Sequence, residues 1–414
     1  MVNFKTLDDF NVKNKTVIVR VDFNSEVDPQ TKRVTNDTRI RAYATTLKEL
    51  AEKGAKVVVL SHQGRKGDPD YTTLKQHAEI LQQIVQSPVK YVDDLFGEKA
   101  KNAIKQLQDG EILVLENVRS WSGETKRGSP EQQSKTELVQ NLAPFADLFV
   151  SDAFSVAHRD NVSMVGFTPV LPSAAGRIME RELRHLSKAL EDPHHPCVYV
   201  MGGAKADDSL EISNYVLNNN VADHVLLGGV TSQLFMAAKG VDLGKETMDF
   251  LAKKGLFKFI PGIQALLSEH PEKILLPTDV ALEVYGKREE IPASQLPSKH
   301  PIFDIGSKTV EKYVQIISTA KSIVVSGPLG VYENSEFCYG TKTVFEAIAN
   351  SGAFSLAGGG NTIAAIDQYG LTDKISYIST AGGALVEFLM GKKLPGVVAL
   401  ETATTTKTLY PIPA

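Results

Sequence analysis

The segment Val17-Ile18-Val19-Arg20-Val21-Asp22-Phe23-Asn24 is a run rich in Val and Ile that ends in polar residues. A run of this kind predicts a buried strand, because strands covered on both faces of a parallel sheet are apolar almost throughout. Similar runs recur along the chain, at Lys56 to Leu60, Ile112 to Leu115, Leu148 to Val150, Val198 to Val200, Val225 to Leu227, Ile274 to Leu276 and Ile323 to Val325. We expect each run to form one strand.

Longer segments with helical spacing of their apolar residues lie between these runs. They are Asp37 to Lys53, Leu74 to Gln86, Ala174 to Leu190, Lys308 to Ile317 and Lys342 to Asn350. The alternation of strand and helix predicts an α/β fold with parallel sheets. Because 414 residues exceed what one hydrophobic core usually serves, we expect two domains.

The composition is that of a soluble globular protein, with 42% hydrophobic and 23% charged residues. Basic and acidic side chains, 45 and 49 of them, are mixed along the chain, so we expect no nucleic-acid partner. No apolar run approaches 18 residues, which argues against a membrane span. Cys197 and Cys338 lie far apart and the first residues lack a signal-peptide pattern, so we expect a reducing, cytoplasmic location.

The residues that follow the predicted strands differ between the two halves of the chain. In the first half they include Asp, Asn, His and Arg, whereas after Val198 they include pairs and triplets of Gly. Open α/β sheets bind ligands beyond the carboxyl ends of their strands. We therefore expect a domain for an acidic ligand up to about residue 170 and a domain for nucleotide phosphates from about 195 to 395.

Cationic side chains cluster after the first-half strands or at the starts of the helices. They are Arg39, His62, Arg65, Arg119, His158 and Arg159. Together they would suit an anion that carries phosphate and carboxylate groups, because guanidinium groups bind such oxygens in pairs. The alternative is that each arginine is a solvated surface residue paired with an acid, and that His62 is structural.

The second half contains neither a Walker loop nor the dinucleotide fingerprint, but it has three glycine clusters. They are Gly202-Gly203-Ala204-Lys205, Gly358-Gly359-Gly360-Asn361-Thr362 and Ser379-Thr380-Ala381-Gly382-Gly383. Glycine exposes backbone amides at a helix start, which can hold phosphate, and Lys205 would add a charge. We expect Asp207, Asp208 or Ser209 to cap the helix after the first cluster. The alternative is that the glycines only allow tight turns.

Ordered motifs from about Thr16 to Leu400 resemble those of phosphoglycerate kinases. They are Val21-Asp22-Phe23-Asn24, Ser61-His62-Gln63-Gly64-Arg65, Leu115-Glu116-Asn117-Val118-Arg119, Asp152-Ala153-Phe154 with Ala157-His158-Arg159, Gly202-Gly203-Ala204-Lys205, Asp304-Ile305-Gly306, Gly327-Pro328-Leu329-Gly330-Val331-Tyr332-Glu333 and Ser379-Thr380-Ala381-Gly382-Gly383-Ala384. The resemblance implies reversible phosphoryl transfer from 1,3-bisphosphoglycerate to ADP, giving 3-phosphoglycerate and ATP, in glycolysis and gluconeogenesis.

The resemblance also implies two Rossmann-like lobes of three layers (αβα), joined by a helix and a hinge that closes. The N-terminal lobe, residues 1–172, would bind 3-phosphoglycerate. Residues 173–192 would form the connecting helix, and residues 193–395 the lobe that binds ATP or ADP with Mg²⁺. The tail, residues 396–414, would return to the first lobe, and we expect no helix after Leu400. Whether the chain is a monomer or a homodimer stays open.

The resemblance implies a site residue by residue. The triose ligand would be held by Asp22, Asn24, Arg39, His62, Arg65, Arg119 and Arg159. The nucleotide would be held by Gly203, Lys205, Glu333 at the ribose, Gly358, Gly359, Gly360, Asn361, Thr362, Gly382 and Gly383. We expect Arg39 and Lys205 to be catalytic, facing the migrating phosphoryl group.

Three positions depart from the family pattern. Ser209 replaces a second lysine, Asn361 a magnesium-binding aspartate, and Ser326 an asparagine. The metal ligand is therefore left unassigned. One alternative is a non-catalytic phosphoglycerate-kinase-like protein that binds nucleotide or anion. Another is a two-domain dehydrogenase or sugar-binding α/β protein, which the missing dinucleotide fingerprint disfavours.

Overall fold

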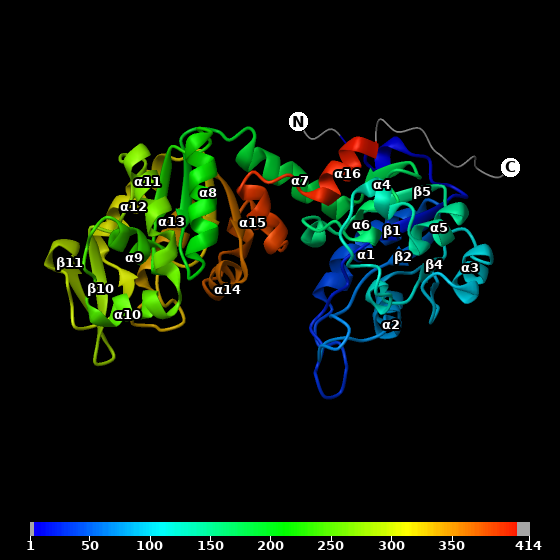
Figure 1. Ribbon diagram of the computed structural model, residues 1–414, viewed down its shortest axis with the longest axis horizontal. Helices are drawn as coiled ribbons and strands as arrows, with labels where there is room; N and C mark the ends of the chain where they lie inside the picture. The colour runs from blue at the N-terminus through cyan, green and yellow to red at the C-terminus, as the bar shows by residue number, and fades with distance from the viewer. Residues whose placement is uncertain (1–3, 404–414) are drawn as a thin grey trace. The chain divides into compact units, whose positions relative to one another are not determined.

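The structure is a computed structural model that describes residues 4–403 (Figure 1). The chain divides into two compact units. Within the described residues, the first unit consists of residues 4–184 and 393–403, and the second unit is His185–Lys392. Each unit contains a parallel sheet flanked by helices, which confirms the predicted α/β class.

The described part of the first unit has a six-stranded parallel sheet with the order β3-β4-β2-β1-β5-β6. Its strands are β1 (Thr16–Arg20), β2 (Lys56–Leu60), β3 (Val89–Tyr91), β4 (Ile112–Val114), β5 (Leu148–Ser151) and β6 (Ser173–Ala175). From β1 the chain first moves outward through β2, and later returns to place β5 on the other side of β1. The carboxyl ends of β1 and β5 are therefore a topological switch point, where this fold opens a crevice for ligands.

Helices cover both faces of this sheet. They are α1 (Thr38–Glu52), α2 (Lys75–Ile84), α3 (Glu98–Lys105), α4 (Pro130–Gln133), α5 (Glu137–Leu142), α6 (Val162–Val165), α7 (Arg177–Leu190) and α16 (Pro395–Ala403). Val17 and Val19 of β1 pack into one hydrophobic cluster, and Ile18 between them packs into another. Both faces of the strand are thus buried, which explains its continuous apolar sequence.

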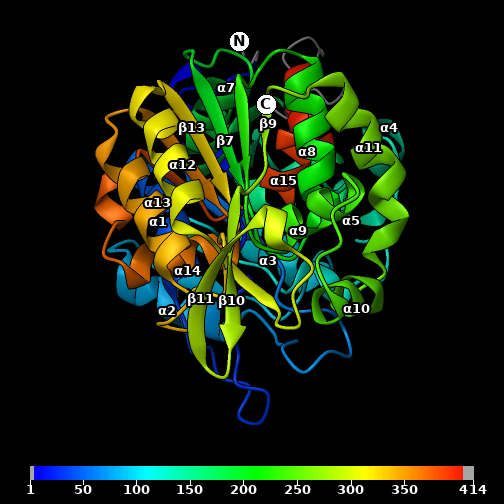
Figure 2. The same cartoon turned by 90° about the vertical axis from the view of Figure 1, so that its left-hand side faces the viewer.

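The second unit has a six-stranded parallel sheet in its described residues, with the order β15-β14-β13-β7-β8-β9. Figure 2 labels β13, β7 and β9 of this sheet. Its strands are β7 (Cys197–Met201), β8 (His224–Leu227), β9 (Ile274–Leu275), β13 (Ser322–Ser326), β14 (Phe354–Gly358) and β15 (Tyr377–Ser379). The order reverses between β7 and β13, so a second switch point lies there. A three-stranded antiparallel sheet, which the sequence reading did not predict, consists of β10 (Asp279–Val284), β11 (Lys287–Pro292) and β12 (Ile302–Ile305).

The helices of the second unit follow the strands closely. They are α8 (Ala206–Asn218), α9 (Gly229–Ala238), α10 (Lys245–Lys253), α11 (Ile260–Glu269), α12 (Ser307–Thr319), α13 (Tyr339–Asn350), α14 (Gly360–Gln368) and α15 (Gly383–Leu389).

Short 3₁₀ turns of both units lie at Leu7–Asp9, Val118–Ser120, Ala143–Phe145, Phe154–Val156, Leu256–Phe259, Ala293–Gln295 and Thr372–Lys374. No helix within residues 4–403 is both long enough and apolar enough to cross a membrane.

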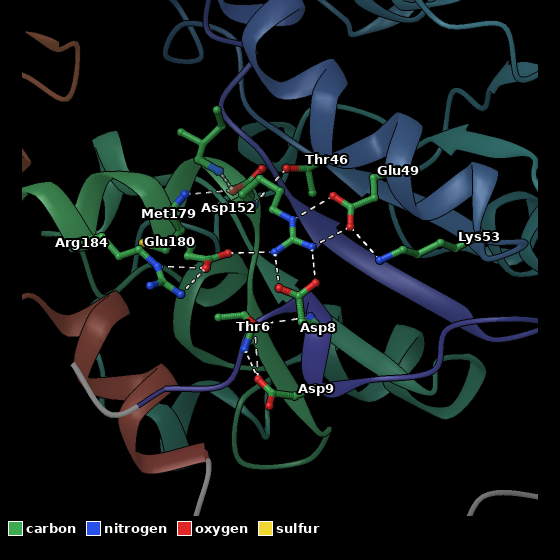
Figure 3. A network of polar contacts seen from close by, with 12 residues as sticks. Thr6, Asp8, Asp9, Thr46, Glu49, Lys53, Asp152, Met179, Glu180 and Arg184 are labelled. Atoms are coloured by element: carbon green, nitrogen blue, oxygen red, sulfur yellow. Dashed lines mark hydrogen bonds and ion pairs between the residues drawn. The ribbon is translucent and has the colours of Figure 1, made fainter. Parts of the chain in front are cut away.

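The predicted helix from Ala174 starts too early. Ser173–Ala175 is strand β6, and α7 begins at Arg177. The Asp152 carboxylate Oδ1 caps the helix by accepting the backbone N–H groups of Ile178 at 2.8 Å and Met179 at 3.0 Å (Figure 3). Gly176 leaves room for this cap, because an added Cβ would lie 2.3 Å from the Asp152 carboxyl carbon.

The end of the described chain also differs from its prediction. α16 continues past Leu400 to Ala403, so the expectation of no helix after Leu400 is wrong for residues 401–403. The remainder of the predicted tail lies outside the described residues. α16 packs against α6 and β6, and the Gly396 N–H donates to the Ala157 carbonyl at 2.9 Å.

Candidate functional site

The switch point of the first unit is organised around Asp22, which follows β1 and is 1% exposed. One oxygen of its carboxylate, Oδ2, accepts hydrogen bonds from Arg39 Nη1 and from the Ser155 hydroxyl. The other oxygen, Oδ1, lies 3.6 Å from Nδ1 of His62, which follows β2. Since Ser155 follows β5, the ends of β1, β2 and β5 converge on one carboxylate.

Asn24 joins this carboxylate to the loop after β2. Its backbone N–H donates to Asp22 Oδ1 at 3.0 Å, and its side-chain oxygen accepts the Gly64 N–H at 2.8 Å. Arg119, in the turn after β4, donates from Nη1 to the Gly64 carbonyl at 2.5 Å. Four of the predicted triose residues, Asp22, Asn24, Arg39 and Arg119, thus lie in one hydrogen-bonded network. His62 lies 3.6 Å from the carboxylate at the centre of this network.

Arg159 and Arg65 are coupled to this network through charge. Burial, and after it the positive charges of Arg159 and Arg20, lower the pKa of Arg119 to about 10. The charge of Arg65 acts in the same direction. Arg65 is exposed, and Arg159 Nε lies 3.3 Å from His158 Nε2. An arginine whose pKa is lowered by neighbouring cations lies in an excess of positive charge, which a bound anion would neutralise.

His62 and Asp22 have opposite electrostatic environments. Burial lowers the pKa of His62 well below its usual value, with the charges of Arg20 and Arg119 acting the same way and Asp22 opposing. The ring is therefore neutral at pH 7. Burial acts to raise the pKa of Asp22, but the charges of His62, when protonated, and of Arg39 outweigh burial and lower it. Asp22 is therefore a carboxylate at neutral pH.

Two residues of this site, Arg20 and Ser155, were not predicted from the sequence. Arg20 is the last residue of β1 and is 1% exposed, although arginine is rarely buried without partners. An arginine inside an apolar strand, two residues before Asp22, was the available signal. Ser155 carried no local signal, because its contact with Asp22 depends on the pairing of β1 with β5.

In the second unit, glycines bring the ends of β7 and β13 together. The N–H of Gly202 donates to the Ser326 carbonyl at 2.8 Å, and that of Gly203 donates to the Pro328 carbonyl at 2.7 Å. A Cβ on Gly202 would lie 2.2 Å from the Pro328 oxygen. Gly203 and Gly327 have φ angles of +74° and +92°, which favour glycine. A side chain at these positions would separate the two strand ends.

Helices start at glycine after several strands of this sheet. Gly228 precedes α9, Gly359 precedes α14 and Gly382 precedes α15, each as the cap residue without a side-chain hydrogen bond. Gly360, Gly382 and Gly383 are exposed, whereas Gly358 is a buried residue of β14. The amides of an uncapped helix start are hydrogen-bond donors for an anion.

Comparison with known proteins identifies the family. The profile described as phosphoglycerate kinase matches residues 7–392. A phosphoglycerate kinase of Methanothermobacter thermautotrophicus is 48% identical over 398 residues, which cover 96% of this chain and 97% of that protein. A second, from Pyrococcus furiosus, is 45% identical over 399 residues, which cover 95% and 97%.

Among solved structures, phosphoglycerate kinase from Pyrococcus horikoshii OT3 superimposes with a TM-score of 0.85 at 41% identity, covering 97% of this chain and all of that one. The chain belongs to the phosphoglycerate kinase family. It is therefore a phosphotransferase that uses a nucleotide in glycolysis, and the non-catalytic alternative is not favoured.

Lys205, the predicted phosphoglycerate kinase lysine, is exposed and occupies the cap position of α8. The prediction that Asp207, Asp208 or Ser209 caps this helix is wrong, because α8 begins at Ala206 and its cap has no side-chain hydrogen bond. Ser209 is 3% exposed, and its hydroxyl lies 3.3 Å from both the Lys205 carbonyl and Thr231 Oγ1. The residue that replaces the family's second lysine thus points into the protein.

The remaining predicted nucleotide residues lie around the other strand ends. Thr362 is buried, and its Oγ1 accepts the Gly327 N–H at 2.7 Å, which joins the start of α14 to the switch point. Asn361 is exposed in the first turn of α14, and Glu333 is exposed in the turn after β13. The structure therefore joins Gly203 and Thr362 through the Gly327-Pro328 segment and leaves Glu333 and Asn361 at the surface.

Phosphoglycerate kinases act on nucleotides, which commonly carry Mg²⁺. Within residues 4–403 no group of three or more His, Cys, Asp or Glu side chains is placed to hold a metal ion. Asn361 offers a neutral amide oxygen at the position where the resemblance predicts a carboxylate. This donor set fits a Mg²⁺ ion that is bound mainly by phosphates and water, and it does not fit a cage built from protein ligands.

Proposed function

We propose that the first unit binds 3-phosphoglycerate or 1,3-bisphosphoglycerate and that the second unit binds ADP or ATP. The observation that carries the proposal is the convergence of Arg39, His62 and Arg119 on the network around Asp22. A triose that bears phosphate and carboxylate groups would balance the excess positive charge there.

The proposed triose-binding residues of the first unit have three different roles. Arg39, Arg65, Arg119 and Arg159 would bind phosphate and carboxylate oxygens, because each guanidinium offers paired donors. The Asp22 carboxylate would accept a hydrogen bond from the triose hydroxyl, and the Asn24 amide would accept one from it or donate one to it. His62 would orient the ligand without exchanging protons, which its lowered pKa supports.

The second unit would bind the nucleotide at the helix starts. Lys205 and the amides near Gly203 would contact phosphate, and Glu333 would bind the ribose. The other nucleotide contacts we propose are Gly358, Gly359, Gly360, Asn361, Thr362, Gly382 and Gly383. Support comes from the uncapped starts of α14 and α15.

Transfer from an acyl phosphate needs no general base, since the acceptor in the reverse direction is a carboxylate ionised at neutral pH. The site must supply charge and alignment. Arg39 and Lys205 would stabilise the migrating phosphoryl group, and amides of the later glycine clusters would donate to its equatorial oxygens. Because the two ligands bind to separate units, a hinge at α7 and after Ser379 would close to bring them together and exclude water.

We propose that Mg²⁺ arrives with the nucleotide, with Asn361 as an outer contact. When bound, the ion would neutralise phosphate charge. We further propose a cytoplasmic location, which fits the two separate free cysteines, Cys197 and Cys338, and a monomeric or homodimeric state.

The test is a coupled assay with ATP and 3-phosphoglycerate on Arg39→Ala and Lys205→Ala. Each variant should lose about 10²-fold or more in kcat, the scale of removing one group that stabilises developing charge. Arg41→Ala is the matched control, because Arg41 is on the same helix as Arg39 and its ion pair with Asp37 is exposed. Folded Arg39→Ala and Lys205→Ala variants that turn over at the parental rate would refute the proposal.

A further inference from the structure

Arg20 is a buried guanidinium at the switch point of the first unit. It is among the largest fully buried side chains of the described residues, with 1% exposure, and it is the last residue of β1. Its Nη1 donates to the Val21 carbonyl, and its Nε donates to the Ser163 hydroxyl at 2.8 Å. Its remaining nitrogen, Nη2, lies 3.3 Å from Nδ1 of His62.

Glu124 holds Ser163 from the other side. The Ser163 hydroxyl donates to Glu124 Oε1 at 2.6 Å, and the Ser163 N–H donates to Oε2 at 3.0 Å. Both residues are completely buried. A hydroxyl has one proton, so giving it to Glu124 leaves the oxygen lone pairs free to accept the Arg20 N–H. Burial raises the pKa of Glu124, against the charge of Arg20 and the hydrogen bonds from Ser163. With Glu124 ionised, the direction of every hydrogen bond from Glu124 to Arg20 is determined.

We infer that Glu124, Ser163 and Arg20 are positioning residues that hold His62 as the neutral tautomer with its proton on Nε2. A guanidinium has five N–H donors and no acceptor. The His62 Nδ1 that faces Arg20 must therefore present a lone pair, and the ring proton must lie on Nε2. This inference rests on the proposed role of His62 in binding the triose anion.

Asp22 competes with Arg20 for the same ring nitrogen. Its Oδ1 lies 3.6 Å from His62 Nδ1, which is longer than a hydrogen bond, and would favour a proton there. The Asp22 oxygens already have donors, however: Oδ2 accepts from Arg39 and Ser155, and Oδ1 accepts the Asn24 N–H. Burial also lowers the pKa of His62, so the doubly protonated ring is not populated at neutral pH.

The tautomer decides what His62 offers to a ligand. With the proton on Nε2 the ring can donate a hydrogen bond to a carboxylate or phosphate oxygen from that nitrogen. With the proton on Nδ1, Nε2 would present a lone pair to the same oxygen, and the two would repel. Glu124 thus acts on His62 through two intermediate residues, Ser163 and Arg20, and through His62 on substrate binding.

Nitrogen NMR of histidine-labelled protein tests the tautomer directly. The chain has nine histidines, so the His62 signals are assigned by their loss in His62→Asn. In the parent at pH 7, we expect the Nδ1 signal of an unprotonated ring nitrogen and the Nε2 signal of a protonated one. A parental ring protonated on Nδ1 overturns the inference, even where Arg39→Ala abolishes turnover and the proposed function stands.

Ser163→Ala and the near-isosteric Glu124→Gln test the positioning roles. We expect mixed His62 tautomers and a KM for 3-phosphoglycerate about tenfold higher, which corresponds to about 1.4 kcal/mol, with kcat nearly unchanged. Ser173→Ala is the control, because its buried hydroxyl bonds only to the Leu171 carbonyl among the described contacts. Unchanged tautomer and KM in both folded variants would refute the positioning roles. Failure of 3-phosphoglycerate to shift the parental His62 signals would instead count against the proposed function.

Discussion

Arg177 binds Glu49 through two parallel hydrogen bonds, from Nε to Oε2 at 2.8 Å and from Nη2 to Oε1 at 2.7 Å. The pair joins the last turns of α1 to the first residue of α7 (Figure 3). The same guanidinium donates to Asp8 at 2.6 and 3.0 Å and to Glu180 at 3.0 Å. The base of α7 is therefore attached to the first unit by a planar group that lysine cannot imitate.

Replacing Arg177 with Lys should destabilise the first unit by about 1–3 kcal/mol, because the Glu49 and Asp8 carboxylates lose their paired donors. The chain has one tryptophan, Trp121, which lies in the first unit, so its fluorescence during urea unfolding reports on that unit. Arg41→Lys breaks an equally bidentate pair with Asp37 that is exposed, and should change the stability by less than about 0.5 kcal/mol. Equal effects of the two substitutions would contradict this account.

Asp152 should make the stability of the first unit depend on pH. Burial raises its pKa to about 7, despite hydrogen bonds from Met179 and Thr46, and its Oδ2 has no hydrogen-bond partner. The folded-state pKa thus exceeds the unfolded value near 3.9, so its contribution is complete below about pH 4 and is lost as pH rises through 7. Asp152→Asn keeps a cap oxygen without the charge. The stability of the parent relative to this variant should fall between pH 4 and 7 and then level off; a constant difference would show that Asp152 does not titrate there.

The backbones at Gly202 and Gly327, which lie close together where β7 and β13 end, should leave no room for a side chain. A Cβ on Gly327 would lie 2.3 Å from the Gly202 oxygen, at a φ of +92°. Gly327→Ala should therefore weaken ATP binding about tenfold or more, measured by calorimetry, and lower the melting temperature. Gly370→Ala is the control that separates backbone strain from steric contact. The φ of Gly370 is +65°, but nothing lies within 4 Å of an added Cβ. It should cost only about 1 kcal/mol and leave ATP affinity unchanged.

The strand ends were predictable from sequence because the signal is local. A run such as Lys56–Leu60 is apolar from its second residue to its last, and His62 follows two residues after Leu60. Since the carboxyl ends of parallel strands share one edge, His62 and Asp22 were expected at the same edge before their order in the sheet was known. The start of α7 was misplaced because its cap, Asp152, lies 26 residues before Ile178 in the chain.

The support for the site was not predictable from sequence. In the sequence, Arg20 is a single polar residue in an apolar strand. Its hydrogen-bond partner Ser163 is 143 positions away. Nothing local distinguishes Glu124 from a surface glutamate. The antiparallel sheet was also missed, because β11 is largely exposed and Lys287–Pro292 carries no apolar run. Burial of a charge is decided by which distant groups meet it, and these depend on the assembled fold.

Asn361→Asp should change the metal dependence of nucleotide binding in a way that separates two effects. Asn361 is exposed in the first turn of α14, where a carboxylate stabilises the helix start by about 0.3–1 kcal/mol. The same charge repels nucleotide phosphates unless Mg²⁺ lies between them. The variant should therefore bind ATP more weakly than the parent without Mg²⁺ and at least as tightly with Mg²⁺ in excess, measured by calorimetry at fixed ionic strength. Asn361→Ala, which adds no charge, should show neither change. If Asn361→Asp weakens ATP binding equally with and without Mg²⁺, the metal does not approach this position, and Asn361 is not an outer contact of the ion.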